Sequence, residues 1–146
     1  VAEGMDPETL YLLGPGTTVK VIADALGVSK TILGVDAVLA GELVGTDLNE
    51  AGILDLLARY AKPARIIVTP IGGNGFIFGR GNKQFTPTVI KNVVRDSIQV
   101  VATRDKLSRL NALRVDSGDF ELDQALAGYM EVVVGYREAM MVKVKC

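Results

Sequence analysis

The stretch LYLLGPGTTVKVIADAL (residues 10–26) changes from one hydrophobic pattern to another within a few residues. Residues 10–13 are a short apolar run typical of a buried strand, and the run ends at Gly14-Pro15-Gly16. From Thr17 to Leu26 the apolar residues recur at helical spacing, and Gly27 follows as a C-cap. The stretch therefore predicts a strand, a tight glycine turn and an amphipathic helix.

Comparable patterns continue through the rest of the chain. Strand-like runs cover residues 31–39, 42–45, 64–69, 98–102, 113–115, 130–134 and 139–144, and helix-spaced runs cover 50–60, 87–94, 103–107 and 119–129. Asn49, Thr86 and Asp119 are the expected N-caps. Alternating strands and helices predict one three-layer α/β domain over residues 1–146, with a mostly parallel sheet and helices on both faces. The last two runs predict an antiparallel C-terminal hairpin that turns at Gly135-Tyr136-Arg137.

Composition limits the chemistry that this chain can perform. Its 146 residues include no histidine and one cysteine, Cys146, which excludes histidine-dependent dyads, histidine-bound metal and an internal disulfide. The net charge of −1 provides no basic field for nucleic acid, and no apolar run reaches a membrane-spanning length. We expect a cytoplasmic protein with no nucleic-acid or membrane partner, and we assign it no metal ligands.

The first candidate site is the turn between the strand at 10–13 and the helix at 17–26. Helix N-termini bind anions because their first N–H groups are unpaired and the helix dipole is positive there. Gly14 and Gly16 allow close approach of a phosphate, and Thr17 and Thr18 add hydroxyl donors. The spacing is neither that of a P-loop nor G-x-G-x-x-G. The alternative is a tight turn capped by threonine.

The second candidate site is the glycine-rich segment from Pro70 to Asn82. Its five glycines would weaken a regular strand, so the segment is typical of a loop that lies against a ligand. We expect it to bind an anionic nucleotide or sugar phosphate. The alternative is a hairpin that carries Phe76 and Phe78 on one face. The residues expected to line the site are Gly72, Gly73, Asn74, Gly75, Arg80 and Asn82.

Charged residues supply weaker candidates. Asp36 lies within an apolar run, where a capping role does not explain it, so it is the candidate for a catalytic or metal-linked contact. Asp116 and Asp119 are interpreted as turn and capping residues. Thr103-Arg104, directly after a predicted strand, can point into the site. The basic side chains interpreted as a solvated face are Lys91, Arg95, Arg104, Lys106 and Arg109.

Together these segments resemble the C-terminal part of the ATP-NAD kinase / acetoin-catabolism X protein family. The resemblance covers nearly the whole chain and is carried by residues 11–27, 30–38, 64–84, 98–103 and 115–138, of which GGNGFIFGRGN is the most specific part. It implies a kinase that uses ATP or polyphosphate, with Mg²⁺, to phosphorylate the adenosine ribose 2′-hydroxyl of NAD. We also expect a homo-oligomer.

The chain departs from that family in one important motif. Members carry an N-terminal Gly-Gly-Asp-Gly-Thr motif, and here Gly72-Gly73-Asn74-Gly75 has an amide where the carboxylate would be. An amide is neither a base nor a strong Mg²⁺ ligand. We therefore expect a C-terminal domain of a longer kinase, inactive alone. A weaker likeness to sugar-phosphate isomerase folds leaves open a non-catalytic sugar-phosphate-binding module, and a structural or oligomerisation domain is the other alternative.

Overall fold

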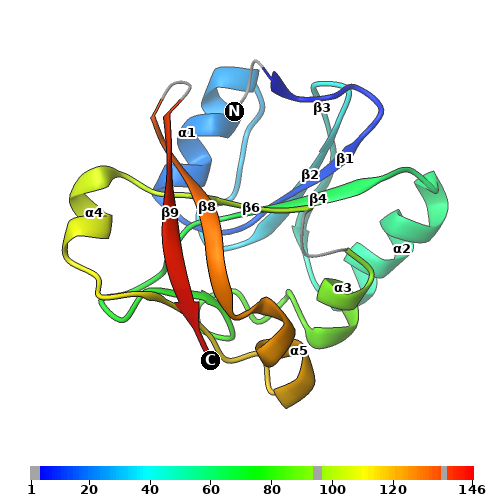
Figure 1. Cartoon of the computed structure of the whole chain (residues 1–146). Helices are drawn as coiled ribbons and strands as arrows, with labels where there is room; N and C mark the ends of the chain where they lie inside the picture. The colour runs from blue at the N-terminus through cyan, green and yellow to red at the C-terminus, as the bar shows by residue number, and fades with distance from the viewer. Residues whose placement is uncertain (1–3, 94–96, 136–137) are drawn as a thin grey trace.

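Strand β1 (Leu10–Leu13) and helix α1 (Thr17–Leu26) form the strand–turn–helix unit predicted from the sequence. The computed structural model describes residues 4–93, 97–135 and 138–146. The other strands are β2 (Val35–Leu39), β3 (Glu42–Leu48), β4 (Ala64–Val68), β5 (Phe76–Phe78), β6 (Ile98–Val101), β7 (Leu113–Val115), β8 (Gly128–Gly135) and β9 (Glu138–Lys145). The other helices are α2 (Glu50–Tyr60), α3 (Pro87–Lys91), α4 (Arg104–Ser108) and α5 (Phe120–Leu126) (Figure 1).

The strands join in one sheet with the order β3-β2-β1-β4-β6-β8-β9-β7-β5. β1, β4, β6 and β8 are parallel neighbours, and β9, β7 and β5 form a second parallel group. β2 and β3 pair antiparallel beside β1, and β8 pairs antiparallel with β9. The predicted α/β class, mostly parallel sheet and C-terminal hairpin are therefore confirmed. The predicted turn residues Tyr136 and Arg137 lie outside the described residues.

Side chains alternate between the two faces of the central strands and build two apolar clusters. Tyr11, Leu13 and Ile67 face one side, where Val19 and Ala23 of α1 cover them. Leu10, Leu12, Ile66 and Val68 face the other side, together with Ile53 and Leu56 of α2 and Val89 and Ile90 of α3. Helices thus cover both faces of the sheet, and in Figure 1 α1 and the α2–α3 pair lie on opposite sides of the view.

The last strands of the sheet pack on the same core as its centre. Ile77 and Phe78 of β5, Leu113 of β7 and Val144 of β9 are fully or almost fully buried in the cluster that contains Ile66 of β4. The sheet must therefore curve around this cluster. Because of the curvature, the glycine-rich segment that contains β5 spans from the centre of the sheet to its far edge.

The predicted helix caps are confirmed in the structure. The side chains of Asn49, Thr86 and Asp119 accept hydrogen bonds from the N–H groups of Gly52, Val89 and Leu122, which begins α2, α3 and α5. Gly27 ends α1 in the left-handed conformation, at φ 75°. These caps are local features, which is why the sequence predicts them well.

Several predicted boundaries differ from the structure, and the strand predicted at 42–45, for example, continues to Leu48. The strand predicted at 31–39 begins only at Val35, because Thr31 turns back to hydrogen bond Asp36. The helix predicted at 87–94 ends at Lys91, and residue 94 lies outside the described residues. The helix predicted at 119–129 ends at Leu126, because Gly128 adopts φ 114° and begins β8.

Candidate functional site

The carboxyl ends of β1 and β4 lie side by side at a point where the chain leaves in two directions. The two strands are parallel neighbours, with Leu13 opposite Ile67. After β1 the chain runs through α1 to β2 on one flank. After β4 it runs through β5, at the far edge of the sheet, and α3 before it returns to β6 on the other flank. In open α/β sheets, ligands bind outside the carboxyl ends of the strands, at the point where the connections leave in opposite directions. We call the space above these strand ends the β1–β4 crevice.

The turn after β1 fits tightly against β4. Gly14 donates its N–H to the carbonyl of Ile67 at 2.9 Å, and a Cβ on Gly14 would lie 3.1 Å from that oxygen. Gly16 has φ 116°, and its Cβ would lie 2.7 Å from Cγ2 of Thr69. Packing alone therefore requires glycine at position 16, whether or not a ligand is present.

Helix α1 begins at this crevice with a free N-terminus. Its N-cap is Gly16, which provides no side chain to accept from the first N–H groups, and the first turn contains no acidic residue. Thr17 is therefore the first helical residue, and the alternative of a threonine cap is wrong. Its side chain is exposed and that of Thr18 is half-buried. The positive end of the helix dipole is left uncompensated, as an anion site requires.

Thr69 lies directly after β4 and faces the same turn. Its side chain contacts the Gly16 position through Cγ2, as the close approach there shows. The residue is only 4% exposed, and its hydroxyl has no hydrogen-bond partner. A buried hydroxyl without a partner is costly, so its presence beside a helix N-terminus is a mark of a ligand site.

Asn82 is linked to the Gly14 turn only indirectly, through Phe85. The Asn82 side chain is fully buried, donates from Nδ2 to the carbonyl of Ile77 at 2.7 Å, and leaves Oδ1 without a partner. Its backbone carbonyl accepts from the N–H of Phe85, whose ring lies 3.2 Å from the Cβ position of Gly14. The structure therefore places Phe85, rather than Asn82 itself, against the turn, and the Asn82 side chain makes its hydrogen bond to Ile77.

The tip of the glycine-rich segment lies elsewhere. Gly72, Gly73 and Asn74 are exposed in a turn closed by the bridge between Ile71 and Phe76. Gly75 is buried at φ 76°, and its Cβ would lie 2.9 Å from the carbonyl of Ala112, before β7. Gly73 has open space around it and no left-handed φ, so packing gives no reason for a glycine there.

Arg80 and its neighbouring glycines are held toward β5 and β7. The Arg80 guanidinium lies over the ring of Phe76, 4.5 Å from its centroid. A Cβ on Gly79 would lie 1.8 Å from the carbonyl oxygen of Asp116, and one on Gly81 would lie 2.6 Å from Cγ2 of Ile71. Close packing thus explains these two glycines. The hairpin alternative is partly right, since β5 forms, but Ile77 rather than Phe76 is fully buried.

Asp36 is held by structural partners. Its Oδ2 accepts from Lys30 Nζ at 3.0 Å and from the N–H and hydroxyl of Thr31, and its Oδ1 accepts from the N–H of Asp47. Neither side chain of the Lys30–Asp36 pair is exposed. Lys30 also donates to the carbonyls of Thr31 and Gly34. These contacts favour a structural role for Asp36, and a catalytic or metal-linked role stays a prediction.

The pKa values of this buried pair follow from its surroundings. Burial lowers the pKa of Lys30, and the ion pair with Asp36 offsets only part of that effect. Burial acts to raise the pKa of Asp36, but the hydrogen bonds from Asp47, Lys30 and Thr31 together outweigh it, so that pKa is lowered. Asp36 is therefore ionised at neutral pH, which suits an anchor for the loop before β2.

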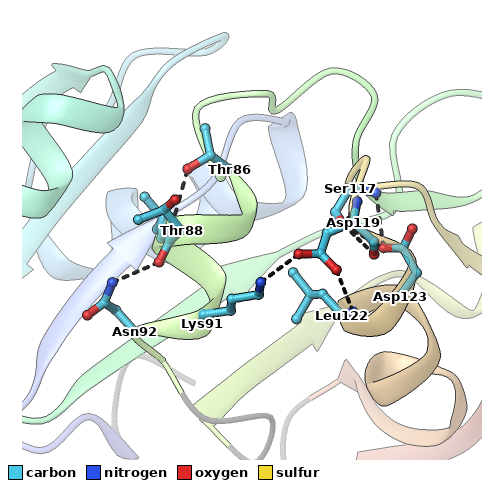
Figure 2. Close-up of polar contacts among 9 residues, drawn as sticks. Thr86, Thr88, Lys91, Asn92, Ser117, Asp119, Leu122 and Asp123 are labelled. Atoms are coloured by element: carbon cyan, nitrogen blue, oxygen red, sulfur yellow. Dashed lines mark hydrogen bonds and ion pairs between the residues drawn. The ribbon is translucent and has the colours of Figure 1, made fainter.

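The acidic residues after β7 also hold helix ends together (Figure 2). Asp119 caps α5 through the N–H of Leu122, and its Oδ2 accepts from Lys91 Nζ at 2.5 Å. The hydrogen bond between the two side chains raises the pKa of Lys91 and lowers that of Asp119. Asp123 accepts from the N–H and hydroxyl of Ser117. This cluster ties α3 to α5.

Metal ligands do not gather in the described part of the chain. No group of three or more His, Cys, Asp or Glu side chains there could hold an ion. Mg²⁺ in phosphoryl-transfer sites is often held by one or two carboxylates together with substrate phosphates. Both carboxylate oxygens of Asp36, which lies opposite Leu13 at the end of β1, already accept hydrogen bonds from Lys30, Thr31 and Asp47.

Two residues that matter, Lys30 and Thr69, are absent from the sequence candidates, and a third, Lys106, is interpreted there as part of a solvated face. Lys30 forms an ion pair with Asp36, six residues later, and no periodicity of the sequence indicates that contact. Thr69 ends a continuous apolar strand, where polar residues of parallel sheets meet ligands. The sequence places Lys106 on the solvated face together with Arg95. Residue 95 lies outside the described residues. The ammonium group of Lys106 instead donates to the carbonyl of Pro70.

The fold is an α/β domain in which a glycine turn joins the first strand to the first helix at the carboxyl ends of β1 and β4. Residues 6–144 match the family model of the ATP-NAD kinase C-terminal domain, so the chain belongs to this family. No curated protein and no solved structure matches the chain. Among the described residues, no helix has both the length and the apolar character needed to cross a membrane.

Proposed function

We propose that this chain is the C-terminal part of an NAD kinase, in which the β1–β4 crevice binds nucleotide phosphates and helps to form the NAD site. The observation that carries the proposal is the meeting of an uncapped helix N-terminus with the buried, unpartnered hydroxyl of Thr69. Membership of the ATP-NAD kinase C-terminal domain family supports the choice of nucleotide. ATP or polyphosphate is the proposed donor, and NAD the proposed acceptor.

The residues of the crevice suit the parts of such a ligand. The N–H groups of Thr17 and Thr18, with their hydroxyls, are donors for phosphate oxygens. The hydroxyl of Thr69 is a further donor, and Oδ1 of Asn82 is an acceptor for a ribose hydroxyl or an amino group. Mg²⁺, when bound, would neutralise phosphate charge, and we propose that it enters on the nucleotide rather than on a carboxylate cluster of this chain.

Thr69→Val is the sharpest test of this proposal. The change keeps the side chain's shape but removes a buried hydroxyl that has no partner, so stability should stay equal or rise. If the hydroxyl contacts the ligand, affinity for ATP or NAD should fall about tenfold in calorimetry, because a hydrogen bond to a charged group is lost. Unchanged affinity would show that Thr69 does not contact the ligand. If the wild-type chain releases no binding heat with ATP, NAD or NADP, the proposed function is wrong.

A structural role is the second candidate, because packing explains glycines 14, 16, 75, 79 and 81 without a ligand. That role predicts no ligand heat and a definite oligomer in sedimentation velocity. A melting shift with ribose or glucosamine phosphates, but not with nucleotides, would instead favour a sugar-phosphate module. Homo-oligomerisation and a cytoplasmic location are further parts of the proposal, which sedimentation and cell fractionation test.

A further inference from the structure

A third strand end lies beside the crevice. β6 is the parallel neighbour of β4, with Val100 opposite Val68, so their carboxyl ends share one edge of the sheet. β6 leads directly into α4, whose N-cap Thr103 accepts from the N–H of Lys106 at 3.1 Å. The short helix therefore begins at the same edge as Gly14 and Thr69.

Lys106 turns from α4 toward the connection that follows β4. Its Nζ donates to the carbonyl of Pro70, the residue after Thr69, and the side chain is half-buried. Arg104, two residues earlier on α4, turns the opposite way and pairs with Glu138 of β9 at 2.7 Å. The two cations of one helix are thus aimed at different places, and only Lys106 is held beside the crevice.

The charge of Lys106 has no acidic partner in the described part of the chain. The neighbouring carboxylate, Asp105, pairs with Arg109 instead. A carbonyl accepts one hydrogen bond without neutralising the ammonium group, which keeps two further donors. A positioned lysine of this kind is a point charge suited to phosphate.

We propose that Lys106 binds a phosphate group of the ligand in the β1–β4 crevice. Arg104, by contrast, forms a structural ion pair with Glu138. The inference rests on the proposed function and extends it to a residue on a third strand connection. Phosphate of the donor and diphosphate of NAD have the same chemistry, so the choice between them is left to the experiment.

Calorimetry on the 146-residue chain tests the proposal with ATP, tripolyphosphate, NAD and adenosine. Lys106→Met should weaken at least one phosphate ligand by about 10- to 100-fold, while Lys106→Arg should keep affinity within a few fold. Arg104→Met is the matched control and should change nothing. Losses confined to ATP and tripolyphosphate assign Lys106 to the donor, and a loss confined to NAD assigns it to the acceptor.

Adenosine has no phosphate, so its binding should be equal in the wild type and Lys106→Met. Equal affinity of both proteins for every phosphate ligand would overturn the inference and leave the proposed function standing. No binding by the wild type would overturn both. If Lys106→Met does not fold, acetylation of the wild type replaces it: ligand should protect Lys106 but not Lys143 of β9, and unprotected Lys106 would contradict the proposal.

Discussion

Gly16 and Gly73 differ in what the fold requires of them. Gly16 has φ 116° and a blocked Cβ position, so Gly16→Ala should lower the free energy of unfolding by about 1–3 kcal/mol. Gly73 has open space and an ordinary φ, so Gly73→Ala should change the free energy of unfolding by less than about 1 kcal/mol. Urea unfolding measures both. If Gly73 lies against a ligand, Gly73→Ala weakens nucleotide binding at unchanged stability; unchanged binding would remove it from the site.

Asp36 should act through stability rather than through chemistry. Asp36→Asn leaves the buried ammonium of Lys30 without its counter-charge and should lower the free energy of unfolding by about 3–5 kcal/mol. Asp24→Asn breaks the exposed pair with Lys20 and should change it by less than about 1 kcal/mol. A stable Asp36→Asn protein that has lost only nucleotide binding would contradict the structural role.

The same carboxylate gives the stability a definite pH dependence. The folded-state pKa of Asp36 is lowered, so the native state holds the proton less tightly than the unfolded state does. Its contribution is complete above the unfolded pKa of about 3.9 and is lost as the pH falls through the lowered folded value. Urea midpoints between about pH 5 and 2 should therefore fall less steeply in Asp36→Asn than in the wild type. Equal pH dependence of the urea midpoints in the two proteins would contradict this contribution of Asp36.

At the scale of elements, helix α1 begins without a side-chain cap, and we propose that its N-terminus binds phosphate. Thr17 is exposed in a first turn that contains no acidic side chain. Thr17→Asp should favour the helix dipole and raise stability by about 0.3–1 kcal/mol, yet repel a phosphate. The melting temperature measured by thermal unfolding should therefore rise, while the phosphate affinity measured by calorimetry should fall. The control Thr17→Asn keeps the size without the charge, and tighter phosphate binding by Thr17→Asp would refute an anion site.

Elements set by local chemistry were predictable from the sequence, and those set by distant contacts were not. Asn49, Thr86 and Asp119 cap helices through bonds within three residues, and all were predicted. The late start of β2 depends on Lys30 and Asp36 meeting across a loop, which no periodicity reports. The glycine-rich segment was recognised, but sequence spacing could not show that Phe85, just after it, contacts Gly14 while Gly75 contacts Ala112 at the far edge.

At the scale of the whole molecule, the carboxyl ends of β1, β4 and β6 collect every group proposed to bind phosphate. Gly14–Thr18, Thr69 and Lys106 come from connections separated by tens of residues, and the parallel pairing brings them to one edge. This edge of the sheet provides hydrogen-bond donors and positive charge. Phosphoryl transfer also needs an acceptor activated and a metal held in place, and the described residues offer no cluster of carboxylates for that.

The chain alone should therefore bind nucleotide without phosphorylating NAD. With ATP or polyphosphate and Mg²⁺, a coupled assay for NADP should show no formation above the buffer control, although calorimetry shows binding. Asn74→Asp, which completes a Gly-Gly-Asp-Gly sequence, should not restore activity, because residue 74 is exposed on the turn between Ile71 and Phe76. Adding a protein segment that carries the family's Gly-Gly-Asp-Gly-Thr motif should restore it. NADP made by the chain alone would show that its own residues complete the catalytic site.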